Sequence, residues 1–185
     1  MPRIAITGPE STGKTTLAAE LARRLPHAAW VPEYARSYPV DLSVGGSYTL
    51  VDLEAIARGQ LVAEDAVAAT LPPDGWLVCD TDLLVILIWA EDRFGFCPEW
   101  LRRAALSPAA YAHRLLLLPD LLWEPDPLRT HPEPAARWEL LARYRAALST
   151  AGLPFTEVSG KGEARVSAAL QALGALQATD ATRPS

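Results

Sequence analysis

Short apolar runs alternate with longer amphipathic stretches along the chain, and this alternation predicts strands and helices in turn. The runs of strand length lie at residues 3–7, 28–33, 76–79, 114–118 and 154–158. Apolar residues at helical spacing separate them, at residues 14–25, 52–70, 83–93, 98–106, 108–112, 135–150 and 163–176. Because the strands are apolar throughout, helices must cover both faces of their sheet. The pattern therefore predicts a three-layer α/β fold with a parallel sheet.

Two further local signals refine this prediction. Asp52 is the expected N-cap of the long helix over residues 52–70. Five prolines lie between Pro119 and Pro134, a composition that neither continues a helix nor pairs as a central strand. We interpret residues 119–137, approximately, as an exposed mobile lid within a single domain of residues 1–177, followed by a frayed tail at residues 178–185.

Composition excludes several classes of protein. The chain has 185 residues, 50% of them hydrophobic, and a net charge of -5, which disfavours both disorder and nucleic-acid binding through a basic face. The spacing of Cys79 and Cys97 matches neither a redox pair nor half of a zinc site. No signal-peptide pattern opens the sequence, and the apolar run at residues 83–90 is too short for a membrane span. We therefore expect a cytoplasmic protein without a membrane partner, whose oligomeric state stays open.

A phosphate-binding loop follows the first predicted strand. Residues 8–15 read GPESTGKT and match G-x-x-x-x-G-K-[ST] between a strand and a helix. We expect Lys14 to reach the β- and γ-phosphates, Thr15 to ligate Mg²⁺, and the Lys14 side chain to face solvent in the empty loop. The motif alone does not separate kinase, ATPase and GTPase, but the chain lacks the guanine-binding NKxD pattern, which favours ATP. The expected ATP-binding residues are Gly8, Glu10, Ser11, Thr12, Gly13, Lys14, Thr15 and Thr16.

Carboxylates follow two of the predicted strands. Asp80 ends the third strand, where it can hold Mg²⁺ through water or act as a helix N-cap, and the two roles can coexist. Glu33 ends the second strand, and both it and Asp82 point toward the crevice at the carboxyl ends of the sheet. Such carboxylates suit an acceptor with hydroxyl groups or a cationic ligand. The alternative is that Glu33 forms a surface ion pair with Arg36, and Tyr34 can pack or stack.

Arginines in and beside the predicted lid are candidates for charge neutralisation. A closing segment that delivers an arginine can offset the charge that builds on a transferred phosphoryl group. Arg129 and Arg137 fit this role, although an arginine on a polar loop is otherwise a solvated residue.

Several motifs together resemble one family. They are the phosphate loop, PEYAR from Pro32, IARGQ from Ile56, DTD from Asp80, Ile88-Trp89, Pro119-Asp120 and the run from Trp123 to Arg129. Over residues 3–172, approximately, the chain resembles the ribosylnicotinamide kinase domain of the NadR-type NAD-biosynthesis proteins. The resemblance implies a P-loop fold of nucleoside-kinase type, with a five-stranded sheet in the order 2-3-1-4-5. It also implies ATP- and Mg²⁺-dependent phosphorylation of the 5′-hydroxyl of nicotinamide riboside.

The resemblance also assigns roles by position. Glu33 corresponds to the residue that handles the acceptor, Asp80 and Asp82 to the pair that serves metal and ribose, and Arg58 and Gln60 to acceptor-site helix residues. Pro127 departs from the glycine that relatives often have and is expected to stiffen the lid. The histidines form no HxGH motif, so neither adenylyltransferase nor repressor activity is expected.

These inferences combine into one set of expectations. The expected catalytic residues are Lys14, Glu33, Asp80, Arg129 and Arg137. The expected substrate-binding residues are Glu33, Tyr34, Arg36, Arg58, Gln60 and Asp82, and the expected metal ligands are Thr15 and Asp80. The predicted function is a nicotinamide riboside kinase. The alternatives are a kinase for another nucleoside or small metabolite and a regulatory nucleotide-sensing ATPase.

Overall fold

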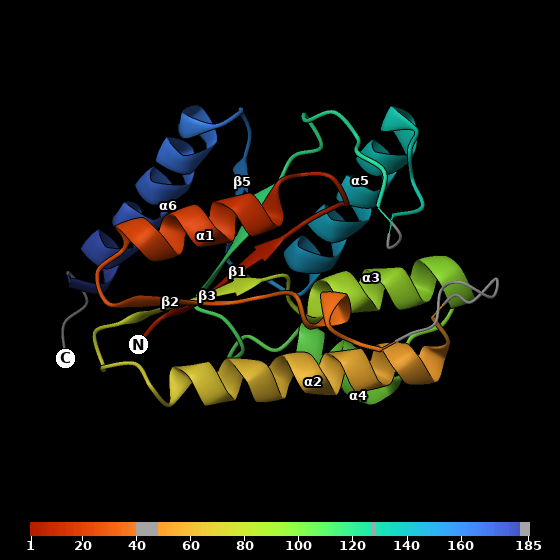
Figure 1. Cartoon of the computed structure of the whole chain (residues 1–185), viewed down its shortest axis with the longest axis horizontal. Helices are drawn as coiled ribbons and strands as arrows, with labels where there is room; N and C mark the ends of the chain where they lie inside the picture. Colours follow the sequence, from red (N-terminus) through yellow and green to blue (C-terminus); the bar gives the residue numbers. More distant parts are fainter. Residues whose placement is uncertain (40–47, 127–128, 182–185) are drawn as a thin grey trace.

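One parallel sheet organises the chain. The computed structural model describes residues 1–39, 48–126 and 129–181. Within these ranges the sheet has five strands in the order β2-β3-β1-β4-β5 (Figure 1). The strands are β1 (Arg3–Thr7), β2 (Ala28–Val31), β3 (Trp76–Asp80), β4 (His113–Leu117) and β5 (Phe155–Val158). All of the strand pairs are parallel, so the predicted sheet and its order are confirmed.

Helices cover both faces of this sheet, as the apolar strands require. They are α1 (Lys14–Arg24), the 3₁₀ turn η1 (Tyr34–Arg36), α2 (Leu50–Ala68), α3 (Leu83–Phe94), α4 (Glu99–Ala105), α5 (Pro134–Thr150) and α6 (Glu163–Ala181). Helices α1 and α6 lie together on one face, above the sheet in Figure 1. Helices α2, α3, α4 and α5 share a hydrophobic cluster on the other face. The three-layer prediction is thereby confirmed.

The central strand β1 shows why its sequence is continuously apolar. Ile4 and Ile6 pack with α1 and α6, whereas Ala5 belongs to a cluster on the opposite face. All three side chains are fully buried. Burial of an isoleucine side chain contributes roughly 1.5–3 kcal/mol, so the apolar run is a direct consequence of two covered faces.

The start of α2 differs from the prediction. Thr49, not Asp52, is the N-cap, and the two residues form a capping box in which each side chain bonds the other's backbone N–H. Asp52 therefore lies inside the first turn, where its negative charge also favours the helix N-terminus.

Residues 108–110 form a turn, and the short helix predicted over residues 108–112 is not formed. The Ala110 N–H donates to Ser107 O at 3.2 Å, and the Ala112 N–H already donates to Arg3 O of β1 at 2.8 Å. Because Ala112 already bonds to β1, this segment leads into the sheet and does not form a helix.

The end of the chain is more helical than expected. Helix α6 continues to Ala181, into the segment for which a frayed tail was predicted, and residues 182–185 lie outside the described part. Pro127, the predicted stiffening residue, also lies outside the described residues. No helix in the described ranges has both the length and the apolar composition that crossing a bilayer demands.

Candidate functional site

The loop between β1 and α1 depends on two glycines for its shape. Gly8 has a φ of 128°, and a Cβ there would lie 2.8 Å from the carbonyl oxygen of Leu117 on β4. Gly13 has a φ of 78° and is the N-cap of α1. A side chain at either position would be strained or crowded, so glycine allows the loop to take this shape without backbone strain.

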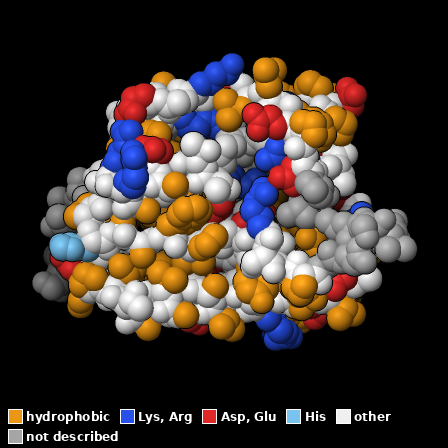
Figure 2. Space-filling model, in the orientation of Figure 1, with side chains coloured by type: hydrophobic (Ala, Val, Ile, Leu, Met, Phe, Trp, Pro, Cys, Tyr) orange, Lys and Arg blue, Asp and Glu red, His pale blue; other side chains and the backbone are white. Residues whose placement is uncertain are grey.

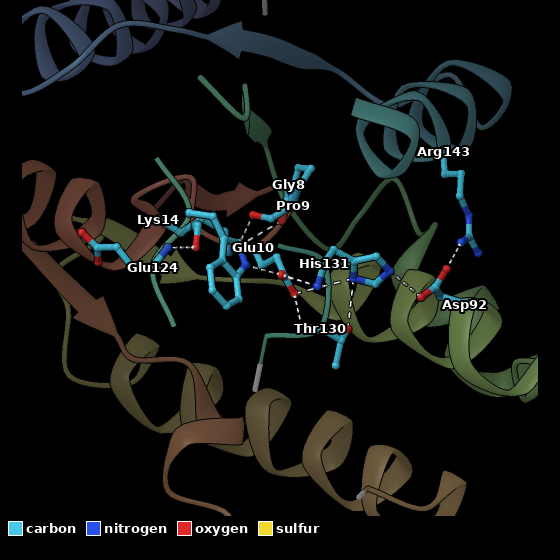
Figure 3. Close-up of polar contacts among 11 residues, drawn as sticks. Gly8, Pro9, Glu10, Lys14, Asp92, Glu124, Thr130, His131 and Arg143 are labelled. Carbon is cyan, nitrogen blue, oxygen red and sulfur yellow. Dashed lines mark hydrogen bonds and ion pairs between the residues drawn. The ribbon is translucent and has the colours of Figure 1, made fainter. Parts of the chain in front are cut away.

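Lys14 folds back onto this loop. Its Nζ donates to the carbonyl oxygens of Gly8 at 3.0 Å and Pro9 at 2.8 Å (Figure 3), so the expectation of a solvent-facing side chain is wrong. Burial lowers the pKa of the Lys14 amine, and the nearby carboxylates of Glu33 and Asp80 oppose that shift. A cation is therefore held where the loop meets both carboxylates.

A cavity of about 420 Å³ opens beside the loop, a size typical of small-molecule sites. Residues 8–16 line one part of it, together with Glu33 and Arg36. An apolar wall on α3 and α5 lines another part and consists of Val85, Ile88, Trp89, Leu140 and Tyr144. In Figure 2, charged side chains gather near the hollow between the upper and lower helices. The cavity thus joins the loop between β1 and α1 to an apolar and aromatic wall.

Asp80 lies at the end of β3 with its side chain fully buried. Neither carboxylate oxygen has a hydrogen-bond partner among the described residues. Burial raises the pKa of Asp80 to about 6, an effect that the neighbouring Thr15 hydroxyl and the Lys14 cation partly oppose. A buried carboxylate without partners is costly, and a hydrated cation beside Thr15 would satisfy it. The donor set fits Mg²⁺, whose remaining ligands would be water and phosphate oxygens.

The described residues contain no cluster of three or more His, Cys, Asp and Glu side chains that could hold a metal. A metal site built wholly from protein side chains is therefore not found in this part of the chain.

Asp82 is engaged away from the cavity. Its Oδ1 accepts from the Thr7 hydroxyl at 2.9 Å, and its Oδ2 accepts from Arg114 Nε at 3.0 Å. Asp82 and Arg114 are both fully buried, and Asp82 does not line the cavity. This placement differs from the predicted ribose contact, because both carboxylate oxygens already hold structural partners.

Three other predicted acceptor residues, Tyr34, Arg58 and Gln60, also lie outside the cavity lining. Arg58 stacks over Trp100 of α4 at 4.1 Å from the ring centroid, which turns it away from the site. Gln60 is buried in α2, and its Oε1 accepts from the Tyr34 N–H at 2.9 Å. Gln60 therefore supports the backbone next to Glu33 and does not face a ligand.

Glu33 forms the ion pair with Arg36 that the sequence left open as an alternative. Its Oε2 lies 3.0 Å from Arg36 Nε, and both residues line the cavity. Arg36 also bonds the Asp126 carboxylate at 3.0 Å. The structure therefore contains the ion pair, and the Glu33 carboxylate also lines the cavity.

Of the two predicted arginines, only Arg129 lines the cavity. Its Nη1 donates to Glu124 O at 2.7 Å, and its charge lowers the pKa of Lys14. Arg137 is buried in α5, where its Nη1 donates to Leu121 O at 3.0 Å. Arg137 thus supports the backbone of the predicted lid from beneath.

Comparison with known proteins places this geometry in a family. The family described as AAA domain matches residues 3–165. The chain belongs to this family. A search of curated proteins gave no match.

Among solved structures, this AAA-domain chain is similar to NadR in complex with NR, with a TM-score of 0.70 and 21% identity over 95% of this chain and 51% of that one. NadR in complex with NAD and AMP-PNP has a TM-score of 0.67 and 23% identity, over 95% and 49% of the two chains. Deoxyadenosine kinase from M. mycoides has a TM-score of 0.57 and 12% identity, over 94% and 99%. The chain spans about half the length of NadR. These likenesses show a P-loop kinase fold.

One residue that stabilises the site was not predicted from the sequence. Arg165 of α6 is buried and donates to Thr12 O in the phosphate loop, to the Asp120 carboxylate, and to Gly160 O at 2.6 Å. It thus ties the loop to the ends of β4 and β5. An arginine in an amphipathic helix carries no sequence signal for this role, although Asp120 stands in one of the motifs that carry the resemblance.

Proposed function

We propose that the chain is a kinase that transfers the γ-phosphoryl group of ATP to the 5′-hydroxyl of nicotinamide riboside, forming nicotinamide mononucleotide in NAD biosynthesis or salvage. The observation that carries this proposal is the cavity that has Lys14 at one end, Glu33 beside it and the aromatic side chain of Trp89 in its wall. Such an arrangement suits a phosphate donor and a ring-bearing acceptor.

The donor half rests on the phosphate loop. Its backbone N–H groups and Lys14 would bind the β- and γ-phosphates, as in other loops of this sequence pattern. Thr15 and Asp80 would hold Mg²⁺, which would supply positive charge that offsets the charge of the phosphates. The two Asp80 oxygens, which have no hydrogen-bond partner in the described part of the chain, support this assignment.

Three side chains take part in the transfer step. The acceptor hydroxyl oxygen bonds to the γ-phosphorus while the bond to the β–γ bridging oxygen breaks and ADP leaves. Glu33 orients the hydroxyl and takes its proton, typically worth on the order of 10²–10⁴-fold in rate. Lys14 and Arg129 offset the charge on the transferred oxygens.

The acceptor half places carboxylates beside the aromatic wall. Glu33 and Asp92 both line the cavity, where Glu33 is paired with Arg36 and Asp92 with Arg143. Nicotinamide riboside combines a cationic aromatic ring with ribose hydroxyls, which matches carboxylates and an aromatic wall. The likeness to NadR solved with NR supports the same choice at the level of fold.

The test measures ADP formation by the purified protein with ATP and Mg²⁺, with and without nicotinamide riboside, and identifies the product by mass spectrometry. We expect turnover to depend on nicotinamide riboside. If the protein phosphorylates another nucleoside of a panel faster, that nucleoside is the acceptor and nicotinamide riboside is not. Equal ATP turnover without any acceptor would instead favour the nucleotide-sensing ATPase.

A further inference from the structure

The phosphate loop makes a second set of contacts, toward the segment that follows β4. Glu10 Oε1 accepts from Trp123 Nε1 at 2.8 Å and from the His131 N–H at 2.7 Å. Glu10 Oε2 accepts from the Thr130 N–H at 2.9 Å (Figure 3). One carboxylate of the loop therefore holds three N–H groups from two separate stretches of the predicted lid.

These stretches flank Arg129. On its N-terminal side, the Glu124 N–H donates to the Ser11 hydroxyl at 3.2 Å, and Glu124 O accepts from the Arg129 guanidinium at 2.7 Å. On its C-terminal side, Thr130 and His131 are held by Glu10. Arg129 thus reaches the cavity from a segment attached to the phosphate loop on both sides.

The attachment extends to the acceptor wall through His131. The His131 ring lies 3.7 Å from Glu10 through Nδ1 and 3.2 Å from Asp92 Oδ2 of α3 through Nε2. Asp92 Oδ1 in turn accepts from Arg143 of α5 at 2.6 Å. Figure 3 shows this line of side chains running from the phosphate loop to α3 and α5.

The charge of Glu10 argues against a role in nucleotide affinity. A carboxylate in a loop that binds a triphosphate repels it, so affinity alone would favour a neutral residue. A carboxylate is nevertheless the group that accepts three N–H groups best, because both oxygens are acceptors and the bonds are charge-assisted. The side chain of Glu10 is only 15% exposed, which keeps those bonds from water.

We propose that Glu10 is a positioning residue that fastens the Arg129 segment to the phosphate loop, and that it contributes nothing to ATP affinity. This inference rests on the proposed kinase function and revises the expectation that Glu10 binds ATP. The loop that receives the phosphates thereby also holds the arginine that neutralises them.

The test compares Glu10→Gln with Glu139→Gln, a matched change at an exposed position on α5. Glutamine keeps the shape but offers one acceptor oxygen, so an N–H of the segment meets an NH₂ group. Trypsin cleavage after Arg129 is followed by mass spectrometry with AMP-PNP and Mg²⁺ present. We expect cleavage at least about tenfold faster in Glu10→Gln and unchanged in the control. AMP-PNP affinity by calorimetry should be equal or tighter.

Turnover supplies a further readout. With nicotinamide riboside, kcat of Glu10→Gln should fall by roughly tenfold or more while KM for ATP stays within about twofold. Trp123→Phe removes one of the three N–H donors and keeps an aromatic ring. We therefore expect a smaller rise in cleavage after Arg129 and a smaller fall in kcat. This second variant decides the matter if Glu10→Gln does not fold.

Unchanged cleavage at Arg129 in both variants would overturn the inference. So would weaker AMP-PNP binding with normal cleavage, because Glu10 would then belong to the ATP site. If the wild-type protein does not phosphorylate nicotinamide riboside, the proposed function fails, whereas cleavage and AMP-PNP affinity still decide the role of Glu10.

Discussion

The buried Asp80 side chain affects both the stability of the ligand-free protein and the binding of Mg²⁺. Burial raises its pKa in the folded protein from 3.8 to about 6. Because the folded state holds this proton more tightly than the unfolded state, stability falls as pH rises from about 4 through 6. The resulting cost is at most about 3 kcal/mol and is fully present above that range.

Asp80→Asn should therefore stabilise the ligand-free protein while weakening its response to Mg²⁺. In chelator at pH 8, we expect the free energy of unfolding in urea to rise by up to about 3 kcal/mol. The difference from wild type should narrow as pH falls toward 4, where the wild-type carboxyl is protonated. A difference that does not vary with pH would contradict the assignment of this shift to Asp80.

Glu33→Gln separates the acceptor role from the donor role. We expect turnover with nicotinamide riboside to fall on the order of 10²–10⁴-fold, because a neutral amide cannot take the hydroxyl proton. The dissociation constant for AMP-PNP, measured by calorimetry, should not change, since the phosphate loop is untouched. Near-normal turnover would mean that Glu33 only forms its ion pair with Arg36. Such a pair contributes less than about 1 kcal/mol to stability.

At the scale of elements, the contact of α2 with η1 positions Glu33. Gly59 of α2 lies so close to Tyr34 that an added Cβ would stand 2.2 Å from its ring. The next residue, Gln60, bonds the Tyr34 backbone N–H. The helix thus fixes the turn that begins directly after Glu33 through one tight contact and one hydrogen bond.

Gly59→Ala should break this fit. We expect it to destabilise the protein by roughly 1–3 kcal/mol in urea unfolding, and to lower acceptor-dependent turnover without weakening AMP-PNP binding. Gly174→Ala is the matched control, because a Cβ on Gly174 in α6 meets nothing within 4 Å. That control should gain up to about 1 kcal/mol from helix propensity. Equal effects of the two changes would argue against a tight η1 contact.

At the scale of the whole molecule, the phosphate loop lies among elements from both covered faces of the sheet. Arg165 ties it to α6 on one face, and Glu10 ties it through His131 to α3 and α5 on the other. We therefore expect a ligand bound at this loop to stabilise the whole fold.

AMP-PNP with Mg²⁺ should accordingly raise the thermal midpoint. At a free concentration about 100 times the dissociation constant, binding adds about 2.7 kcal/mol, which corresponds to about 5–10 °C for a chain of this size. Differential scanning fluorimetry measures the shift, and Lys14→Ala should remove most of it. No shift with the wild-type protein would contradict nucleotide binding at this loop.

Local sequence signals determined the layers, the sheet and the phosphate loop. The apolar period of each strand and the GPESTGKT motif involve residues that are neighbours along the chain, so their geometry follows from backbone preferences and burial. Where a local signal was shared between neighbours, as with Thr49 and Asp52, the prediction missed the N-cap by three residues.

Only the tertiary structure decided which polar residues face the cavity. Asp80 and Asp82 share one short motif, yet Asp80 has no hydrogen-bond partner among the described residues, whereas Asp82 accepts from Arg114, 32 residues away. Glu10 meets His131 across 121 residues, and Arg165 reaches Thr12 across 153. Such pairs depend on how finished elements pack against one another, and no periodicity within a single element records that packing.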